Sequence, residues 1–366
     1  MIPILLAICL PYISPLMLNR RRPSFVILLL SGLLLASCGA SKSSDSSFFR
    51  MRGVVVAWDD VKDSASIDWI RIMKESGLNT ISVFGNEDSE DYSAFKEKCI
   101  SEGIDFEYED HAMSSLLPRE LFAAHPEYFR MDENGNRVAD GNGCPSSKEG
   151  LEIIMGNVAG FAKKRAPSNH KYYAWLFDGG DICHCPECKG MGTSDQGLLF
   201  ENHIIRALKK IDPEAQLAHL AYHNSTEAPK IVKPEEGIFL EFAPFFRRWD
   251  RPLCDTTAVS DRTHYGWGHK DYLRMLKENL AVFPAETAQV LEYWLDVSLV
   301  SDWKKPQKEL TFHKDVFEQD LKTYAELGIR NITCYGAWLD AYYVRTYGDI
   351  SFVSEYGEGL RDFTGK

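Results

Sequence analysis

The chain has 366 residues and a formal net charge of −12 at pH 7, with 45% apolar and 12% aromatic residues. This acidic balance leaves no basic footprint for nucleic acid, so we expect no nucleic-acid partner. A chain of this length can bury a substantial core, as one large domain or two. Tyr and Trp rings can stack on sugars, although most aromatic side chains in any protein belong to its core.

The first residues are typical of a targeting segment. Three arginines at residues 20–22 precede an apolar run over residues 25–36. This run is too short to cross a bilayer comfortably and is typical of a signal-peptide core. It ends in LASC (residues 35–38), which resembles the lipobox of bacterial lipoproteins. The resemblance implies cleavage before Cys38 and a lipid on that cysteine.

We therefore expect residues 1–37 to be a signal peptide, with Met17 as the true start. Residues 38–50 then hold the lipidated cysteine and a flexible polar tether. A transmembrane anchor is the alternative interpretation of the apolar run. The expected location is the bacterial cell envelope, at the outer membrane, cell surface or periplasm, with membrane contact through the lipid alone. Residues 51–366 remain for a folded domain.

From residue 53 onward, apolar runs typical of strands alternate with helix-like stretches. Residues 66–77 and 92–103 carry helical patterns that each end on a glycine. The expected strands are residues 53–58, 79–85, 104–109, 172–178, 216–223, 237–244, 289–296 and 330–338. Helical patterns fall in most of the seven gaps between them, and this alternation predicts a parallel sheet.

Eight such units in about 300 residues predict an α/β fold of the (β/α)8 or TIM-barrel type. The alternative is an open doubly wound sheet, but the chain has no Gly-rich phosphate loop of the GxGxxG or GxxxxGK type to support it. Barrel active sites lie at the C-terminal ends of the strands. Carboxylates and aromatic side chains recur at the expected strand ends, which suits a carbohydrate cleft.

Two segments carry a resemblance to a known family. HPEYFRMDENGNRVADGNGCPSS (residues 125–147) is followed by LFDGGDICHCPEC (residues 176–188). Together they are similar to bacterial glycan-degradation lipoproteins catalogued as domain of unknown function 4838. In that group a His-Pro-Glu-aromatic segment and a Cys-Pro-Ser turn precede an Asp-bearing strand end and a C-x-C-x-x-C loop. The resemblance covers about residues 110–300.

That group resembles α-glucuronidases and β-N-acetylhexosaminidases, which are (β/α)8 glycosidases. The resemblance therefore implies action on glycans linked through uronic acid or N-acetylhexosamine. The chain departs from the hexosaminidases at one point. Those enzymes end strand four with an Asp-Glu pair, whereas here Asp181 is followed by Ile182. This departure argues against a substrate-assisted mechanism with a Glu acid at that position.

Four cysteines are expected to meet in space. Cys183, Cys185 and Cys188 share one loop after the fourth expected strand, and Cys144 lies in the long loop before that strand. Both loops belong to the same face of a barrel, so the four thiolates can surround one ion, and tetrahedral zinc suits four sulfurs. Such a closed site is structural, and its expected role is to hold Asp178 in place.

Disulfides are the alternative, because the expected compartment is oxidising. Cys183 and Cys185 would be strained partners, so bridges would use Cys144 or Cys254. His184 is a further candidate ligand. A catalytic cysteine loop, either redox-active or with zinc holding an open position, is the least favoured interpretation. Apart from zinc, no cofactor is expected.

Glycoside hydrolysis generally needs an acid to protonate the leaving oxygen and a second carboxylate as nucleophile or base. The candidates at the expected strand ends are Asp178, Asp181, Glu241 and Glu292. Asp178 and Glu292 come first, because the aromatic neighbours of Glu292 would raise its pKa by desolvation. Glu241 comes next. The alternative for each carboxylate is a buried salt bridge inside the barrel mouth.

Six residues near the same strand ends are expected to bind the substrate. They are His111, His223, Arg248, Tyr293, Trp294 and Trp338. Histidines can hydrogen-bond sugar hydroxyls, an Arg fork matches the carboxylate of a uronic acid, and aromatic rings can stack on sugar faces. The alternatives are structural histidines, a solvated loop and core aromatics.

The sequence thus predicts a glycoside hydrolase-like lipoprotein with a carbohydrate substrate and an acid/base pair at the barrel mouth. The second hypothesis is a non-catalytic glycan-binding lipoprotein on the same fold, because a fold does not fix a function. Two acids facing each other across one cleft favour the enzyme. A single acid lining the cleft favours the binding protein.

Overall fold

The computed structural model describes residues 47–62, 67–85, 89–260, 262, 265–348 and 350–365. The expected signal peptide and lipidated Cys38 lie outside these residues. The described residues belong to one compact unit that spans Ser46–Lys366. Among them, no helix has both the length and the apolar character that a membrane span requires.

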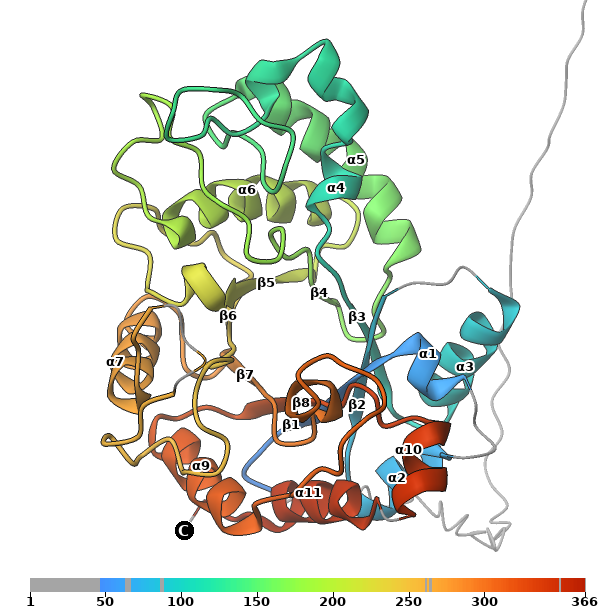
Figure 1. Ribbon diagram of the computed structural model, residues 1–366. Helices are drawn as coiled ribbons and strands as arrows, with labels where there is room; N and C mark the ends of the chain where they lie inside the picture. The colour runs from blue at the N-terminus through green and yellow to red at the C-terminus, as the bar shows by residue number, and fades with distance from the viewer. Residues whose placement is uncertain are drawn as a thin grey trace, which may run out of the picture. The chain divides into compact units, whose positions relative to one another are not determined.

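Eight parallel strands form a nearly closed barrel (Figure 1). They are β1 (Met51–Ala57), β2 (Thr80–Phe84), β3 (Asp105–Glu109), β4 (Lys171–Tyr172), β5 (Gln216–Ala221), β6 (Ile238–Phe242), β7 (Gln289–Glu292) and β8 (Asn331–Tyr335). Their order is β3-β2-β1-β8-β7-β6-β5-β4. All eight expected strands are confirmed, and with them the (β/α)8 architecture.

The two end strands of this order, β3 and β4, are joined by backbone hydrogen bonds just beyond their ends. The Trp175 N–H donates to the Asp110 carbonyl at 2.9 Å, and the Ala112 N–H donates to the Trp175 carbonyl at 3.1 Å. Strand β4 itself has two residues, fewer than the expected residues 172–178. The apolar pattern of that segment therefore marks burial more than it marks ladder pairing.

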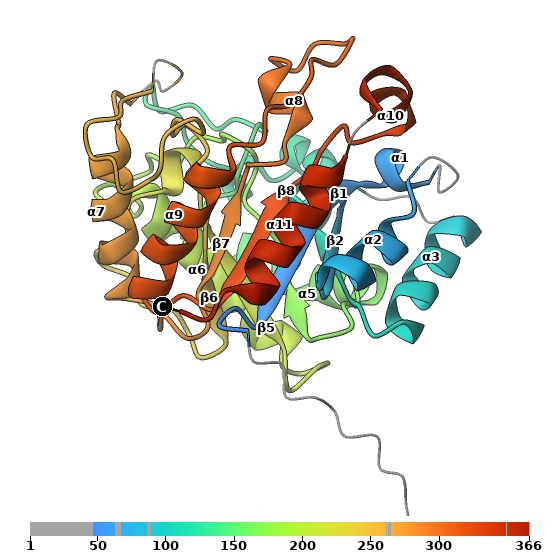
Figure 2. The same ribbon diagram turned by 90° about the horizontal axis from the view of Figure 1, so that it is seen from below.

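Helices occupy most connections and surround the barrel (Figures 1 and 2). They are α1 (Trp58–Val61), α2 (Trp69–Ser76), α3 (Glu90–Ser101), α4 (Met113–Leu116), η1 (Arg119–Ala123), η2 (Pro126–Tyr128), α5 (Lys148–Lys164), α6 (Thr193–Leu208), η3 (His223–Ser225), α7 (His269–Leu280), α8 (Val297–Val300), α9 (Lys314–Glu326), α10 (Ala341–Tyr347) and α11 (Ser351–Asp362). Between β5 and β6, where every residue is described, the chain forms the 3₁₀ turn η3 and no α-helix.

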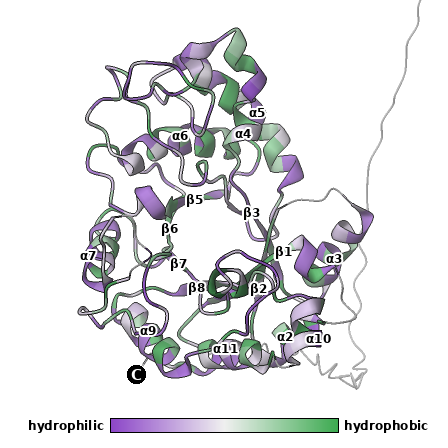
Figure 3. Ribbon diagram, viewed as in Figure 1, coloured by the Kyte–Doolittle hydropathy of each residue, from purple (hydrophilic) through white to green (hydrophobic). Residues whose placement is uncertain are grey.

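Helix α2 illustrates how local sequence sets these boundaries. It begins after Asp68, whose side chain accepts the Arg71 N–H at 3.0 Å, a cap worth about 1 kcal/mol. It ends at Gly77, whose φ of 85° lies in the left-handed region that glycine adopts without strain. Figure 3 shows hydrophobic residues along strands such as β1 and β2, and mixed hydrophobic and hydrophilic residues on the outer helices.

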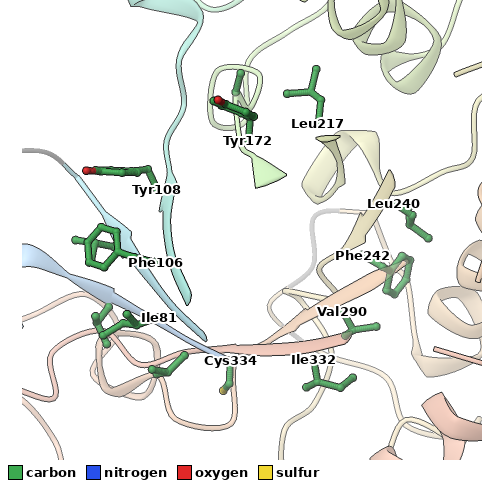
Figure 4. Packing of buried hydrophobic residues seen from close by; sticks show 14 of the residues in the cluster. Ile81, Phe106, Tyr108, Tyr172, Leu217, Leu240, Phe242, Val290, Ile332 and Cys334 are labelled. Carbon is green, nitrogen blue, oxygen red and sulfur yellow. The ribbon is translucent and has the colours of Figure 1, made fainter. Parts of the chain in front are cut away.

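Successive strand residues face opposite sides of the barrel wall. One set packs outward against the helices and forms the main core, as Ile81, Phe106, Val290 and Ile332 do in Figure 4. The other set fills the barrel interior and forms a second apolar cluster, which includes Val55, Tyr173, Phe239, Leu291 and Tyr293. On β7, Leu291 and Tyr293 thus face inward, while Val290 and Glu292 face the helix layer.

Candidate active site

A cavity of about 840 Å³ lies at the C-terminal ends of the strands, where a barrel carries its site. We call it the first cavity. Ten of its lining residues are Phe, Tyr or Trp, and its three carboxylates are Asp178, Asp296 and Asp302. Its volume falls within the range of about 300–1,000 Å³ that is usual for small-molecule sites. Aromatic faces beside carboxylates suit a carbohydrate.

Five of the expected site residues line this cavity. They are His111, Asp178, His223, Tyr293 and Trp338. The Asp178 side chain is exposed at the cavity, directly after the segment that follows β4. The His223 ring shares a hydrogen bond of 2.8 Å between its Nδ1 and the Tyr265 hydroxyl. The fold therefore brings a carboxylate, two imidazoles and two aromatic rings to one cavity.

Glu292 does not reach the first cavity, which corrects the expectation that it faces the substrate. Because Leu291 and Tyr293 point into the barrel, Glu292 points outward into the layer of helices. There its carboxylate accepts hydrogen bonds from Arg247 Nε at 3.2 Å and from the Tyr324 hydroxyl, and it is fully buried. Asp320 also contacts Arg247. Glu292 is therefore part of a buried ion-pair network, the alternative considered for it.

Glu241 and Asp181 are also absent from the cavity lining. Glu241 is fully buried inside the barrel, where it accepts hydrogen bonds from Trp175 Nε1 at 2.8 Å and Gln289 Nε2 at 3.0 Å. Burial raises its pKa above the usual value. Asp181 is exposed on the cysteine loop and lies 3.4 Å from Arg130 Nη2. Neither geometry supports the catalytic role expected for these two carboxylates.

A second cavity of about 570 Å³ adjoins the first and shares part of its lining. The two remaining expected binding residues, Arg248 and Trp294, line this second cavity and are absent from the first. Arg248 holds Asp250 with its guanidinium, at 2.9 Å from Nε to Oδ1. Trp294 is buried and donates its Nε1 hydrogen to Asp320 at 3.1 Å. Trp294 is therefore largely a core residue.

Asp296 is a cavity carboxylate that the expected catalytic set did not include. It caps helix α8, and its Oδ1 accepts the Ser298 hydroxyl at 2.6 Å and the Leu299 N–H at 3.1 Å. Only 2% of the residue is exposed. Burial raises the pKa of Asp296 to about 7, although these hydrogen bonds oppose the rise. Such a carboxyl group can hold a proton near neutral pH and release it during a reaction.

Asp178 and Asp296 both act on the hydroxyl of Tyr222, a third residue of the cavity lining. Burial raises the pKa of Tyr222, and the carboxylates of Asp178 and Asp296 raise it further. The two acids occupy contrasting settings, because Asp178 is exposed and Asp296 is buried. Pairs of carboxylates in contrasting environments are how enzymes separate acid and base roles.

Backbone strain is concentrated at the same cavity. Among the described residues, five non-glycine residues have positive φ, and four of them line the first cavity. Those four are His223 (φ 51°), Asp302 (φ 54°), Trp303 (φ 52°) and Trp338 (φ 65°). Each such residue costs about 1–3 kcal/mol, and such strain clusters at functional sites. The sequence does not predict this strain, because none of the four is a glycine, the residue that usually occupies positive-φ positions.

The four cysteines expected at the metal site do meet. The Sγ atoms of Cys144, Cys183, Cys185 and Cys188 all lie within 4.8 Å of one another, and all four residues are buried. Cys144 and Cys185 have their sulfurs 3.7 Å apart. Four sulfurs placed about 2.3 Å from one ion would stand about 3.8 Å apart. A disulfide needs about 2.05 Å. The cluster therefore has the spacing of a metal site, and Cys254 is exposed and outside it.

Polar contacts tie the cysteine loop to the rim of the first cavity. The side chain of Gln196 bonds both the N–H and the carbonyl of Cys183, at 2.9 and 3.0 Å. Asn142, two residues before Cys144, accepts the Phe177 N–H at 2.9 Å. Asn224 donates to the Gly180 carbonyl at 3.0 Å. The segment that carries Asp178 is thus held on both sides by residues of other loops.

No curated protein matches the chain. It is similar to a solved glycoside hydrolase family 20 β-N-acetylglucosaminidase, with a TM-score of 0.46 and 11% identity over 87% of this chain and 71% of that one. It is also similar to a β-galactosidase from the psychrophilic Marinomonas ef1, with a TM-score of 0.41 and 12% identity over 78% of this chain and 54% of that one.

A family model described as "Domain of unknown function (DUF4838)" matches residues 53–345. The match begins within β1 and ends within α10, so it includes most of β1, the other seven barrel strands, the cysteine cluster and all the lining of the first cavity. The chain belongs to the DUF4838 family.

Proposed function

We propose that this protein is a glycoside hydrolase that acts on glycans linked through uronic acid or N-acetylhexosamine. The observation that carries the proposal is the first cavity, in which aromatic rings surround the exposed carboxylate of Asp178 and the buried carboxyl group of Asp296. The third carboxylate of the lining, Asp302, is paired with Arg262 and Lys308. Aromatic faces bind the apolar faces of sugar rings, and the two carboxylates supply the acid and the second group that glycosidic cleavage needs.

In this mechanism Asp296 is the general acid. Its raised pKa keeps a proton available near pH 7, and the proton passes to the glycosidic oxygen as the bond to the leaving sugar breaks. Asp178, exposed at the same cavity, attacks the anomeric carbon or takes a proton from the attacking water. Tyr222 lines the same cavity, and burial together with both carboxylates raises the pKa of its hydroxyl.

Binding in the first cavity is assigned to its aromatic rim. Trp303 is 55% exposed, an unusual state for an indole, and it lines the cavity together with Trp338. Both indoles can stack on a sugar face. His111 and His223 offer ring nitrogens to hydroxyl groups. For a uronic acid, Arg248 at the adjoining second cavity supplies a guanidinium fork that suits a carboxylate, which the sugar would take over from Asp250.

We also propose that the four-cysteine cluster holds structural zinc. The donor set and the 3.7 Å separation of the Cys144 and Cys185 sulfurs fit a tetrahedral Cys₄ site. Donors already point at the sulfurs: the Met131 N–H lies 3.3 Å from Cys183 Sγ, and Arg137 Nη1 lies 3.9 Å from it. Zinc there would fix the loop behind Asp178.

The cellular place of the protein is part of the same proposal. The lipobox-like LASC sequence supports a lipoprotein anchored to the bacterial cell envelope through Cys38. Metabolic labelling of the full chain with a radioactive fatty acid tests this. Label in the wild type that disappears in Cys38→Ser supports the anchor, and an unlabelled wild type contradicts it.

The second candidate is a non-catalytic glycan-binding protein. Two observations favour it: Glu241 and Glu292 are sequestered from the cavity, and Asp181 lacks the glutamate that follows it in hexosaminidases. Both hypotheses predict a glycan in the first cavity. They differ in whether that glycan is cut.

Mass spectrometry of products separates the two functions. The compact unit, residues 46–366, is incubated with a broad glycan panel as wild type, Asp178→Asn and Asp296→Asn. Cleavage by the wild type that collapses in both variants establishes the hydrolase. Retention of glycans without cleavage establishes the binding protein. Full activity in Asp296→Asn removes Asp296 as the acid. Asp255→Asn, a half-buried carboxylate outside both cavities, is the matched control.

A further inference from the structure

The second cavity adjoins the first one. The two share Trp249, Arg262, Tyr293 and Leu299, so only one layer of side chains lies between them. Each volume, about 840 and 570 Å³, falls within the range of about 300–1,000 Å³ that takes a drug-sized ligand. A single sugar in the first cavity leaves the second one unused.

The chemistry of the second cavity differs from that of the first. Three segments contribute polar side chains to it: Arg248 and Asp250 after β6, Ser260 before α7, and Glu309, Thr311 and His313 before α9. These groups include both hydrogen-bond donors and acceptors. A pyranose carries hydroxyl groups around its ring, and each hydroxyl both donates and accepts. The second cavity therefore suits the polar edge of a sugar, and the aromatic first cavity suits its apolar face.

Trp249 marks the junction between the two cavities. Its Nε1 is buried and, among the described residues, has no hydrogen-bond acceptor. The Arg262 guanidinium lies over the indole ring, 5.6 Å from the ring centre. A buried indole N–H without an acceptor is costly, about 1–3 kcal/mol, and native proteins rarely tolerate one. The Nε1 atom is closed off from both cavities, but the Trp249 side chain lines each of them, so a ligand that passes from one cavity to the other would contact this residue.

We propose that the second cavity is a further sugar subsite, so that the ligand is an oligosaccharide that extends from the first cavity past Trp249 into the second. The inference rests on the proposed glycan binding of the first cavity. It does not depend on catalysis, because a binding protein would use the same two subsites.

Calorimetric titration with oligomers of increasing length tests the subsite. The probes are N-acetylglucosamine oligomers and galacturonic acid oligomers, from monomer to hexamer, and the protein is Asp296→Asn to prevent cleavage. We expect affinity to rise about tenfold once the oligomer enters the second cavity, equivalent to one or two net hydrogen bonds. Further units beyond that length add little.

Two variants fill the second cavity from exposed positions. Val259→Trp and Thr311→Trp place an indole in it, and neither residue lines the first cavity. Both should lose the tenfold gain and keep the wild-type affinity for the monomer. Ile231→Trp is the matched control, because Ile231 is as exposed as Val259 (64% against 59%) and lines neither cavity. It should keep the gain.

The outcomes distinguish this subsite from the function on which it rests. Monomer binding with no gain at any length overturns the second subsite and leaves the first cavity as a sugar site. A gain that persists in both filled variants also overturns it. Failure of every oligomer to bind overturns both proposals together.

Discussion

Replacing Asp296 with Asn should make the protein more stable relative to the wild type as the pH rises. The substitution keeps the shape of the side chain and an oxygen that can cap α8, so the Ser298 and Leu299 contacts at Oδ1 can persist. What it removes is the carboxylate whose ionisation burial opposes. The pKa of 3.8 for an ordinary Asp and about 7 in the folded protein differ by an amount equivalent to about 4 kcal/mol.

The sign follows from proton counting. As the pH rises, Asp296 of the unfolded chain loses its proton near pH 3.8, whereas the folded protein keeps it until about pH 7. Between these values the unfolded state binds fewer protons, so the free energy of unfolding of the wild type falls with pH. Asn does not ionise, so residue 296 of the variant adds no pH dependence to the free energy of unfolding. The free energy of unfolding of the variant minus that of the wild type should therefore rise by about 4 kcal/mol from about pH 4 to about pH 8.

Urea unfolding at several pH values in this range measures the difference. Asp255→Asn is the control: hydrogen bonds from the Thr257 hydroxyl and N–H lower the pKa of this carboxyl below 3.8, so its titration falls outside the range. A constant difference between Asp296→Asn and the wild type across the range would refute the reasoning. It would mean that Asp296 is hydrated and ionised in the folded protein, and it would remove the physical basis for its role as a general acid.

Three further predictions follow from the same geometry. Metal analysis of the purified protein should find one zinc per chain, and Cys188→Ser should lose the zinc and lower the melting temperature; a zinc-free wild type with the four thiols oxidised contradicts the site. Glu292→Ala should cost about 3 kcal/mol in urea unfolding, because it removes a partner of the buried Arg247, while glycan affinity stays unchanged. Trp303→Ala should weaken glycan binding about fivefold, about 1 kcal/mol, at unchanged stability, since its indole is exposed. A loss of stability in Trp303→Ala would instead assign the indole to the core.

The strands and the cysteine cluster were predictable because their signals are local. Each strand is a short apolar run between polar turns, and all eight runs were found. The cysteines lie on two loops that the barrel topology places on one face, so the fold alone brings Cys144 to Cys183, Cys185 and Cys188.

The side that a strand residue faces was not predictable in the same way. In a parallel barrel both faces of the wall are buried, so the apolar run is nearly continuous and its alternation is lost. The segment QVLEYWLD therefore did not reveal that Glu292 faces the helices while Tyr293 faces the cavity. Asp296 ends the same expected strand, but it was not chosen as a catalytic candidate, because its position depends on the backbone of the loop after β7.

The strained residues of the first cavity are held by specific partners, and this argues that the cavity is preorganised. The Trp338 N–H donates to the Asp60 carboxylate at 2.7 Å. Asp302 pairs with Arg262 at 3.1 Å and with Lys308 at 2.8 Å.

Burial raises the pKa of Asp60 to about 6, although the hydrogen bond from the Trp338 N–H lowers it. Ionised Asp60 is therefore itself unfavourable at this buried position. Strain of about 1–3 kcal/mol per residue persists only where the surroundings over-determine the backbone. A cavity that formed by chance between loops would not need such partners. Rigid aromatic walls lower the conformational entropy that the protein must lose when a ligand binds, and this offsets part of the entropy that a flexible oligosaccharide loses.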